Sequence, residues 1–120
     1  MTFLTRPQRG EVWRVNFDPT IGSEVKKTRP AVVMNITEVG RLPLCIVVPV
    51  TGWENGYAAL SWFVHLPATD ENGLTKESGA DAFQVKSLSI KRLTSKLGAL
   101  TETETSAIAD AIALCVGYTP

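Results

Sequence analysis

The stretch GSEVKKTRPAVV, from Gly22 to Val33, changes from a charged loop to an apolar run at an Arg-Pro pair. The residue before a proline is biased toward extended geometry. Pro30 also lacks an N–H, which suits the first position of a strand. We therefore expect Arg29 to stand extended at the mouth of a strand that begins PAVV, beside a long exposed loop over FDPTIGSEVKKT.

On both sides of this stretch, short segments either alternate apolar and polar residues or are continuously apolar, and both patterns are typical of β-strands. Strands are predicted over GEVWRVNF (10–17), PAVVMNI (30–36), LCIVVPV (44–50) and WFVHL (62–66), with two more in 73–90 broken near Gly79. Gly40 and Pro43 supply a turn between the second and third strands. The sequence therefore predicts a mainly β chain with sharp turns.

One helix is predicted at the C-terminal end. Thr101 stands three residues before Glu104, which is the spacing of a capping box. Ile108, Ala111, Ile112 and Cys115 then fall on one face, and Gly117 ends the run. The fold class is thus mainly β with α (α+β): a small, strongly bent antiparallel sheet or partly open barrel, with the helix covering one side.

Composition indicates one ordinary domain over residues 1–120. Hydrophobic residues make up 44% and charged residues 20% of the chain. No apolar run approaches the roughly 18 residues that a membrane span needs, and the first residues lack a signal-peptide pattern, so we expect a cytoplasmic protein without a membrane partner. Cys45 and Cys115 sit in apolar surroundings and are predicted to be buried. With His65 the only histidine, no metal site is expected.

Charge is balanced overall but unevenly distributed. Residues 1–41 carry seven basic and four acidic side chains, residues 54–82 one basic and five acidic, and residues 86–96 four basic and none acidic. Such a chain can hold an anionic ligand on a positive face. Solvated charged faces without a ligand explain the same distribution, and the sequence leaves both interpretations open.

Arg29 and Thr51 are the candidate pair for chemistry. Pro49 is expected to end regular pairing of the third strand, with Thr51 just past it. If the second and third strands form an antiparallel hairpin, Arg29 and Thr51 meet at one sheet edge. An arginine fork matches phosphate oxygens and a threonine adds a hydroxyl donor, while Glu24 offers a carboxylate. The alternative is a surface cation beside a turn residue.

The segments RGEVWRVNFDPTIGSE, TRPAVV, VPVT, QVKSL and KRL together resemble the MazF family of type II toxin–antitoxin ribonucleases. They extend from Arg9 to about Leu93, with a similar helix beyond. The resemblance implies an SH3-like antiparallel β-barrel with a C-terminal helix, the plasmid-toxin fold that CcdB and MazF share. It also implies a cytoplasmic, metal-independent endoribonuclease that uses no cofactor, cuts single-stranded mRNA, forms a homodimer and is inhibited by a cognate MazE-like antitoxin.

The resemblance also places the site. The family's catalytic arginine and threonine correspond to Arg29 and Thr51, its GSE loop to Ser23 and Glu24, and its glutamine to Gln84. Some relatives have a catalytic aspartate directly before that glutamine, where this chain has Phe83. Asp81, expected to share the face of Phe83 on a strand, receives no acid or base role, and the departure favours a site built on arginine and threonine.

The reaction implied is attack of an RNA 2′-OH on the adjacent phosphorus, which leaves a 2′,3′-cyclic phosphate and a 5′-OH. Arg29 and Thr51 are expected to stabilise the phosphorane. An arginine stays protonated far above neutral pH, so Glu24 is the better candidate base. Stacking of bases is expected on Trp53 and on Phe17, for which a core position is the equal alternative. Backbone phosphates are expected on Lys26, Lys27 and Lys86.

Two rival functions remain at this point. One is a gyrase-poisoning toxin of the same barrel type, like CcdB, which acts through a C-terminal Trp-Gly-Ile end. This chain finishes Gly-Tyr-Thr-Pro, which counts against that alternative. The other is an SH3-like binding module without chemistry, in which Arg29 and Thr51 would have no catalytic purpose.

Overall fold

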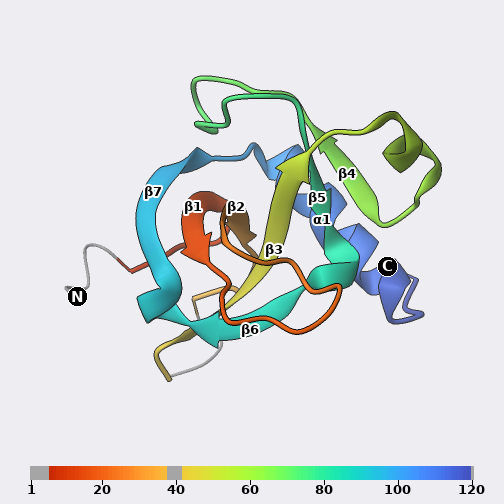
Figure 1. The fold of residues 1–120 in the computed structure, drawn as a ribbon. Helices are drawn as coiled ribbons and strands as arrows, with labels where there is room; N and C mark the ends of the chain where they lie inside the picture. The colour runs from red at the N-terminus through yellow and green to blue at the C-terminus, as the bar shows by residue number, and fades with distance from the viewer. Residues whose placement is uncertain (1–5, 38–41, 120) are drawn as a thin grey trace.

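The computed structural model describes residues 6–37 and 42–119, which form a strongly bent antiparallel sheet with one α-helix against it (Figure 1). The strands of this part of the chain are β1 (Glu11–Asn16), β2 (Thr28–Val33), β3 (Leu44–Gly52), β4 (Phe63–Leu66), β5 (Ser78–Asp81), β6 (Lys86–Ser89) and β7 (Leu93–Ala99). Short 3₁₀ helices join some of them: η2 (Asn55–Ala59), η3 (Ala82–Gln84) and η4 (Ile90–Arg92). The α-helix is α1 (Glu102–Cys115).

β3 is the central strand of the sheet. The strand order is β4-β5-β3-β2-β1-β7, with β6 also paired to β3. β3 pairs with β2 on one side, while β6 and then β5 follow it on the other. The order runs from β4 to β7 without joining them, so the sheet curls without closing. The predicted antiparallel β fold with a C-terminal helix is confirmed, and of the predicted forms the structure shows the partly open barrel.

Ala31, Val32 and Val33 of the PAVV run are buried, on alternate faces of the sheet. Val32 and Val48 lie in the cluster that includes Ile108 of α1. Ala31 and Val47, one residue along each strand, lie in a second cluster inside the curl with Leu88. Because successive side chains of a strand point to opposite faces, a strand covered on both sides needs a continuous apolar run rather than an alternating one.

The predicted helix is confirmed. The Thr101 hydroxyl accepts from the Glu104 N–H at 3.1 Å, and the Glu104 carboxylate accepts from the Thr101 N–H at 3.0 Å, which completes the capping box. The helix packs on β4 and η3, and it ends before Gly117, whose φ is 78°. No helix of the described residues is long and apolar enough to cross a membrane.

The sequence predicts strand ends at Pro30 and Pro49, and both predictions are wrong. β2 begins at Thr28, and Pro30 lies opposite Arg14 of β1. β3 continues through Pro49 to Gly52, because β5 takes over as its partner from Val50 onward. Thr51 is therefore held within a strand rather than in a turn.

Other boundaries also differ from the prediction. The break between the last two predicted strands falls at η3, and Gly79 lies inside β5. β2 ends at Val33, before the predicted end of its strand. β7 was not predicted, because most of its side chains are exposed and give no apolar pattern. Cys45 is buried as expected, but Cys115 is only half-buried. The predicted turn residue Gly40 lies outside the described residues.

Candidate active site

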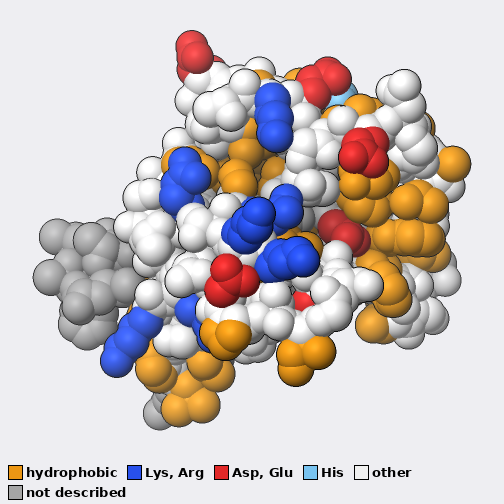
Figure 2. Space-filling view, in the orientation of Figure 1, with side chains coloured by type: hydrophobic (Ala, Val, Ile, Leu, Met, Phe, Trp, Pro, Cys, Tyr) orange, Lys and Arg blue, Asp and Glu red, His pale blue; other side chains and the backbone are white. Residues whose placement is uncertain are grey.

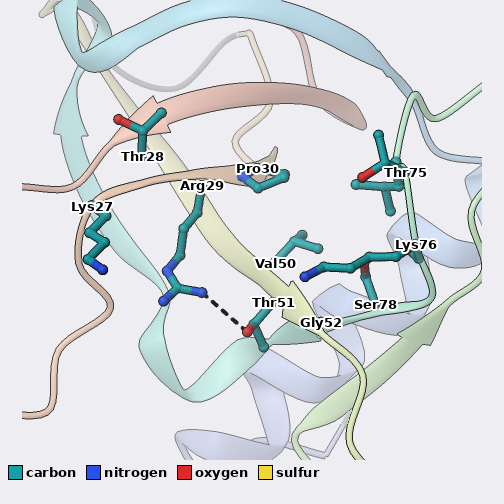
Figure 3. Close-up of a pocket in the computed structure, with 11 residues that line it drawn as sticks. Lys27, Thr28, Arg29, Pro30, Val50, Thr51, Gly52, Thr75, Lys76 and Ser78 are labelled. Atoms are coloured by element: carbon teal, nitrogen blue, oxygen red, sulfur yellow. Dashed lines mark hydrogen bonds between the residues drawn. The ribbon is translucent and has the colours of Figure 1, made fainter.

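Arg29 and Thr51 meet across β2 and β3. The register pairs Ala31 with Pro49, and two residues further along the strands lie Arg29 and Thr51. Arg29 Nη1 donates to Thr51 Oγ1 at 3.3 Å (Figure 3). Arg29 Nε donates to the Lys26 carbonyl oxygen at 2.9 Å. Both side chains remain half-buried. The predicted meeting of the two residues is present, and other N–H groups of the guanidinium remain available to a ligand.

The pair forms the shared wall of two hollows. One, here the lysine hollow, has a volume of about 220 Å³. The other, here the carboxylate hollow, has a volume of about 250 Å³. Besides Arg29 and Thr51, the lysine hollow is lined by Lys27, Thr28, Pro30, Val50, Gly52, Leu74, Thr75, Lys76 and Ser78. The carboxylate hollow is lined by Ser23, Glu24, Val25, Lys26, Pro49, Tyr57, Phe63, Asp81 and Gln84.

Gln84 fixes the loop that carries the predicted carboxylate. Its Oε1 accepts from the Val25 N–H at 2.6 Å, and its Nε2 donates to Asp81 Oδ2 at 3.1 Å. Both ends of the amide are thus occupied by the protein. The arrangement makes Gln84 a residue that positions the loop around Glu24, on the wall of the carboxylate hollow.

Glu24 faces the same hollow from the loop. Its Oε1 accepts from the Ile21 N–H at 2.7 Å, and its Oε2 lies 3.9 Å from Lys86 Nζ. The side chain is 50% exposed, so this ion pair is weak. Ser23 and Lys26 line the hollow on either side of Glu24. The structure therefore gathers these predicted residues around one cavity, with Lys86 at the outer side of Glu24.

Phe17 is a core residue, and the prediction that it stacks bases is wrong. It is 2% exposed and packs in the cluster inside the curl. The Lys86 ammonium covers its ring at 5.8 Å from the centroid. Trp13, Val15 and Phe17 are two residues apart and therefore point to one face. The alternation that predicted β1 continues one residue past the strand.

Trp53 is half-buried and lies outside both hollows. Its ring packs edge-on against Tyr57 and His65, with centroids 5.7 Å and 4.7 Å away. The aromatic side chains that do line the carboxylate hollow are Tyr57 and Phe63, stacked with centroids 4.0 Å apart. Sequence reasoning missed both, because Phe63 reaches the site through the pairing of β4 with β5, and Tyr57 of η2 stacks on Phe63.

Asp81 is a second carboxylate on the wall of the carboxylate hollow. It is 8% exposed, whereas Phe83 is 70% exposed. The expectation that the two share a face is wrong, since the chain turns into η3 directly after Asp81, whose Oδ1 accepts from the Phe83 N–H at 3.2 Å. Asp81 thus lies near the Arg29–Thr51 pair while Phe83 points away.

Lys and Arg side chains gather in the middle of the face drawn in Figure 2. Across residues 6–37 and 42–119, no three His, Cys, Asp or Glu side chains form a cluster suited to a metal ion. Burial raises the pKa of the Cys45 thiol to about 11, so that this cysteine is an unreactive core residue. The side chains that line the two hollows include arginine, threonine, lysines and carboxylates.

Comparison with known proteins identifies the family of this chain. Residues 8–116 match the family described as PemK-like, MazF-like toxin of type II toxin-antitoxin system. The chain belongs to the PemK/MazF-like toxin family. Endoribonuclease MazF9 of Mycobacterium tuberculosis is 33% identical over 114 residues, which cover 89% of this chain and 93% of the relative.

Solved structures of other PemK/MazF-like toxins share the fold. Deinococcus radiodurans MazF superposes with a TM-score of 0.77 at 26% identity, covering 92% of this chain and 96% of that one. A MazE-MazF structure from the same organism gives a TM-score of 0.71 at 26% identity, covering 95% and 99%. Family membership supports the endoribonuclease toxin over the gyrase-poisoning toxin and the binding module without chemistry.

Proposed function

We propose that the chain is a sequence-specific, metal-independent endoribonuclease that cleaves single-stranded mRNA and thereby inhibits translation and growth. The observation that carries this proposal is the Arg29–Thr51 hydrogen bond on the wall between two hollows. A phosphate at this wall receives donors from both residues. The relative MazF9 is itself named an endoribonuclease, which supports the same reaction for this chain.

In the proposed reaction the substrate supplies its own nucleophile. The 2′-oxygen of one ribose forms a bond to phosphorus, and the bond from phosphorus to the next 5′-oxygen breaks. A base takes the 2′-hydroxyl proton and an acid returns one to the 5′-oxygen. The products carry a 2′,3′-cyclic phosphate and a 5′-OH, and DNA is spared because it lacks the nucleophile.

Arg29 and Thr51 stabilise the charge that develops on the phosphorane. The Thr51 oxygen accepts from Arg29, which leaves the hydroxyl hydrogen to be donated to a phosphate oxygen. Donors held in place before the reaction lower its barrier by roughly 2.7 to 4 kcal/mol each. Glu24 is the proposed base, since it lines the hollow and its second oxygen has, among the described residues, only the distant contact to Lys86.

Three further properties belong to the proposal. The toxin acts in the cytoplasm, as a homodimer, and a cognate MazE-like antitoxin holds it inactive. The solved MazE-MazF structure supports an antitoxin partner. Light scattering of the purified chain measures the dimer, and co-expression with the antitoxin is expected to restore growth that the toxin alone arrests.

The test of activity is digestion of a long single-stranded RNA in EDTA beside a DNA of the same sequence. We expect cuts at one short repeated sequence in the RNA and none in the DNA. Thr51→Val, which keeps the size of the side chain but removes the hydroxyl, is expected to slow cleavage about a hundredfold. RNA that remains intact, or cleavage that requires a divalent cation, would overturn the proposal.

A further inference from the structure

Lys76 lies in the lysine hollow with its ammonium group beside the Arg29–Thr51 pair. The side chain extends across the hollow from the segment before β5 toward these residues (Figure 3). Nothing in the motifs around Arg29 and Thr51 indicates it, because it stands 25 residues beyond Thr51 in the chain.

Gly52 makes room for this lysine. A Cβ added to Gly52 would lie 3.1 Å from both Cε and Nζ of Lys76. The aliphatic part of the Lys76 side chain therefore passes over Gly52, where no side chain blocks it. Behind it, Ser78 Oγ donates to the Lys76 carbonyl oxygen at 2.9 Å, and the Trp53 N–H donates to the Glu77 carbonyl oxygen at 3.0 Å. The backbone that carries Lys76 is thus fixed to the end of β3.

The charges of the two hollows differ. The lysine hollow is lined by Lys27, Arg29 and Lys76, with no carboxylate and no aromatic ring among its lining residues. Within the described part of the chain, no carboxylate oxygen lies within 4.0 Å of Lys76 Nζ. The carboxylate hollow instead combines two carboxylates with Tyr57 and Phe63. An anion is favoured in the first hollow, and a ribose or base in the second.

An RNA strand crossing the Arg29–Thr51 wall must continue on both sides of it. Its next phosphate then needs a site one nucleotide away from the scissile phosphate. We propose that Lys76 binds this neighbouring, non-scissile phosphate and so sets where the strand lies relative to Arg29 and Thr51. This inference rests on the proposed endoribonuclease function and assigns the lysine hollow to the RNA backbone.

The test compares Lys76→Met, Lys76→Arg and the control Lys91→Met, an exposed lysine outside both hollows. Methionine keeps a stem of similar length and removes the charge. We expect Lys76→Met to lower kcat/KM roughly tenfold, mostly through KM, and Lys76→Arg to retain activity. In Lys76→Met the slope of log KM against log salt concentration should be smaller than in the wild type by about 0.7, because one phosphate contact with a single strand is lost. Lys91→Met should match the wild type.

A change in the substrate makes the test independent of folding. A short RNA is made with a neutral methylphosphonate at one phosphate at a time. Neutralising the phosphate next to the cut should weaken wild-type cleavage by the same factor as Lys76→Met, and should have no further effect on Lys76→Met. Equal sensitivity of both proteins at every position would overturn the inference while leaving the nuclease intact. RNA left uncut by the wild type would overturn the proposed function itself, and this inference with it.

Discussion

Arg29 and Thr51 face each other two residues beyond the last β2–β3 pair, with Nη1 3.3 Å from Oγ1. The contact joins the ends of two neighbouring strands and divides the lysine hollow from the carboxylate hollow. Each residue orients the other, so that their contributions to catalysis are expected to depend on one another.

This dependence is measured by a double-mutant cycle. Arg29→Lys keeps the charge but loses the planar fork and the Nε bond to the Lys26 carbonyl oxygen. We expect Arg29→Lys and Thr51→Val each to lower the single-turnover rate about a hundredfold. The rate of the double variant should fall by less than the product of the two single-variant factors, because each substitution also removes the partner of the other residue. Strictly multiplicative losses would show that the two residues act separately.

Gln84 is expected to act by holding the loop. Gln84→Met removes the acceptor of the Val25 N–H and should destabilise the protein by about 1 kcal/mol. Amide exchange at Val25 should become faster, and cleavage should slow because Glu24 loses its position. Gln8→Met is the control, since the exposed Gln8 side-chain amide donates to the Arg6 carbonyl oxygen, away from Val25 in the sequence. Unchanged exchange at Val25 would contradict the positioning role.

Glu11 gives the fold a dependence on acid pH. Burial raises the pKa of Glu11, but hydrogen bonds from Trp13 and Lys96 and from the Gln8 N–H outweigh it, and the net pKa is below the ordinary 4.5. A carboxyl group with a lowered folded pKa stabilises the protein fully above its unfolded pKa, and that stabilisation is lost as pH falls through the folded pKa.

Glu11→Gln tests this linkage by urea unfolding at about pH 7 and about pH 3. We expect the variant to be less stable than the wild type at the higher pH, with the difference shrinking at the lower one. Glu102→Gln, on the exposed first turn of α1, is the control. A difference that stays constant with pH would contradict the lowered pKa.

Gly73 is required by the turn before β5. Its φ is 69°, and a Cβ there would lie 2.1 Å from the Leu97 carbonyl oxygen of β7. Gly73→Ala is expected to destabilise the protein by about 3 kcal/mol or more. Gly56→Ala is the matched control, because nothing lies within 4 Å of its added Cβ. Thermal unfolding measures both, and equal melting temperatures would contradict the close approach.

The parts of the site that the sequence could predict are those set by local order. Arg29 and Thr51 could be brought together because antiparallel neighbours place the start of one strand beside the end of the next. The capping box at Thr101 and Glu104 was equally local. Glu24 was a candidate because its loop adjoins Arg29, and the family resemblance also indicated it. Gln84 came from the resemblance alone, and the structure adds that Gln84 holds the loop around Glu24.

The parts that could not be predicted depend on long-range pairing. Lys76 and Phe63 reach the hollows through the β3–β5 and β4–β5 pairs, whose register no local pattern specifies. Tyr57 reaches its hollow by stacking on Phe63. β7 was missed because an exposed edge strand has no apolar period. Asp81 was wrongly predicted to share the face of Phe83, because the directions of the two side chains depend on the turn into η3.

The most direct test of the central claim is the chemistry of the RNA ends, measured by mass spectrometry after cleavage in EDTA. Wild type and Arg14→Ala, an exposed arginine on the neighbouring strand β1, should give 2′,3′-cyclic phosphate and 5′-OH ends at the same sites. Arg29→Ala should give none while keeping the wild-type fold. Ends bearing a 5′-phosphate, or unchanged cleavage by Arg29→Ala, would contradict the account.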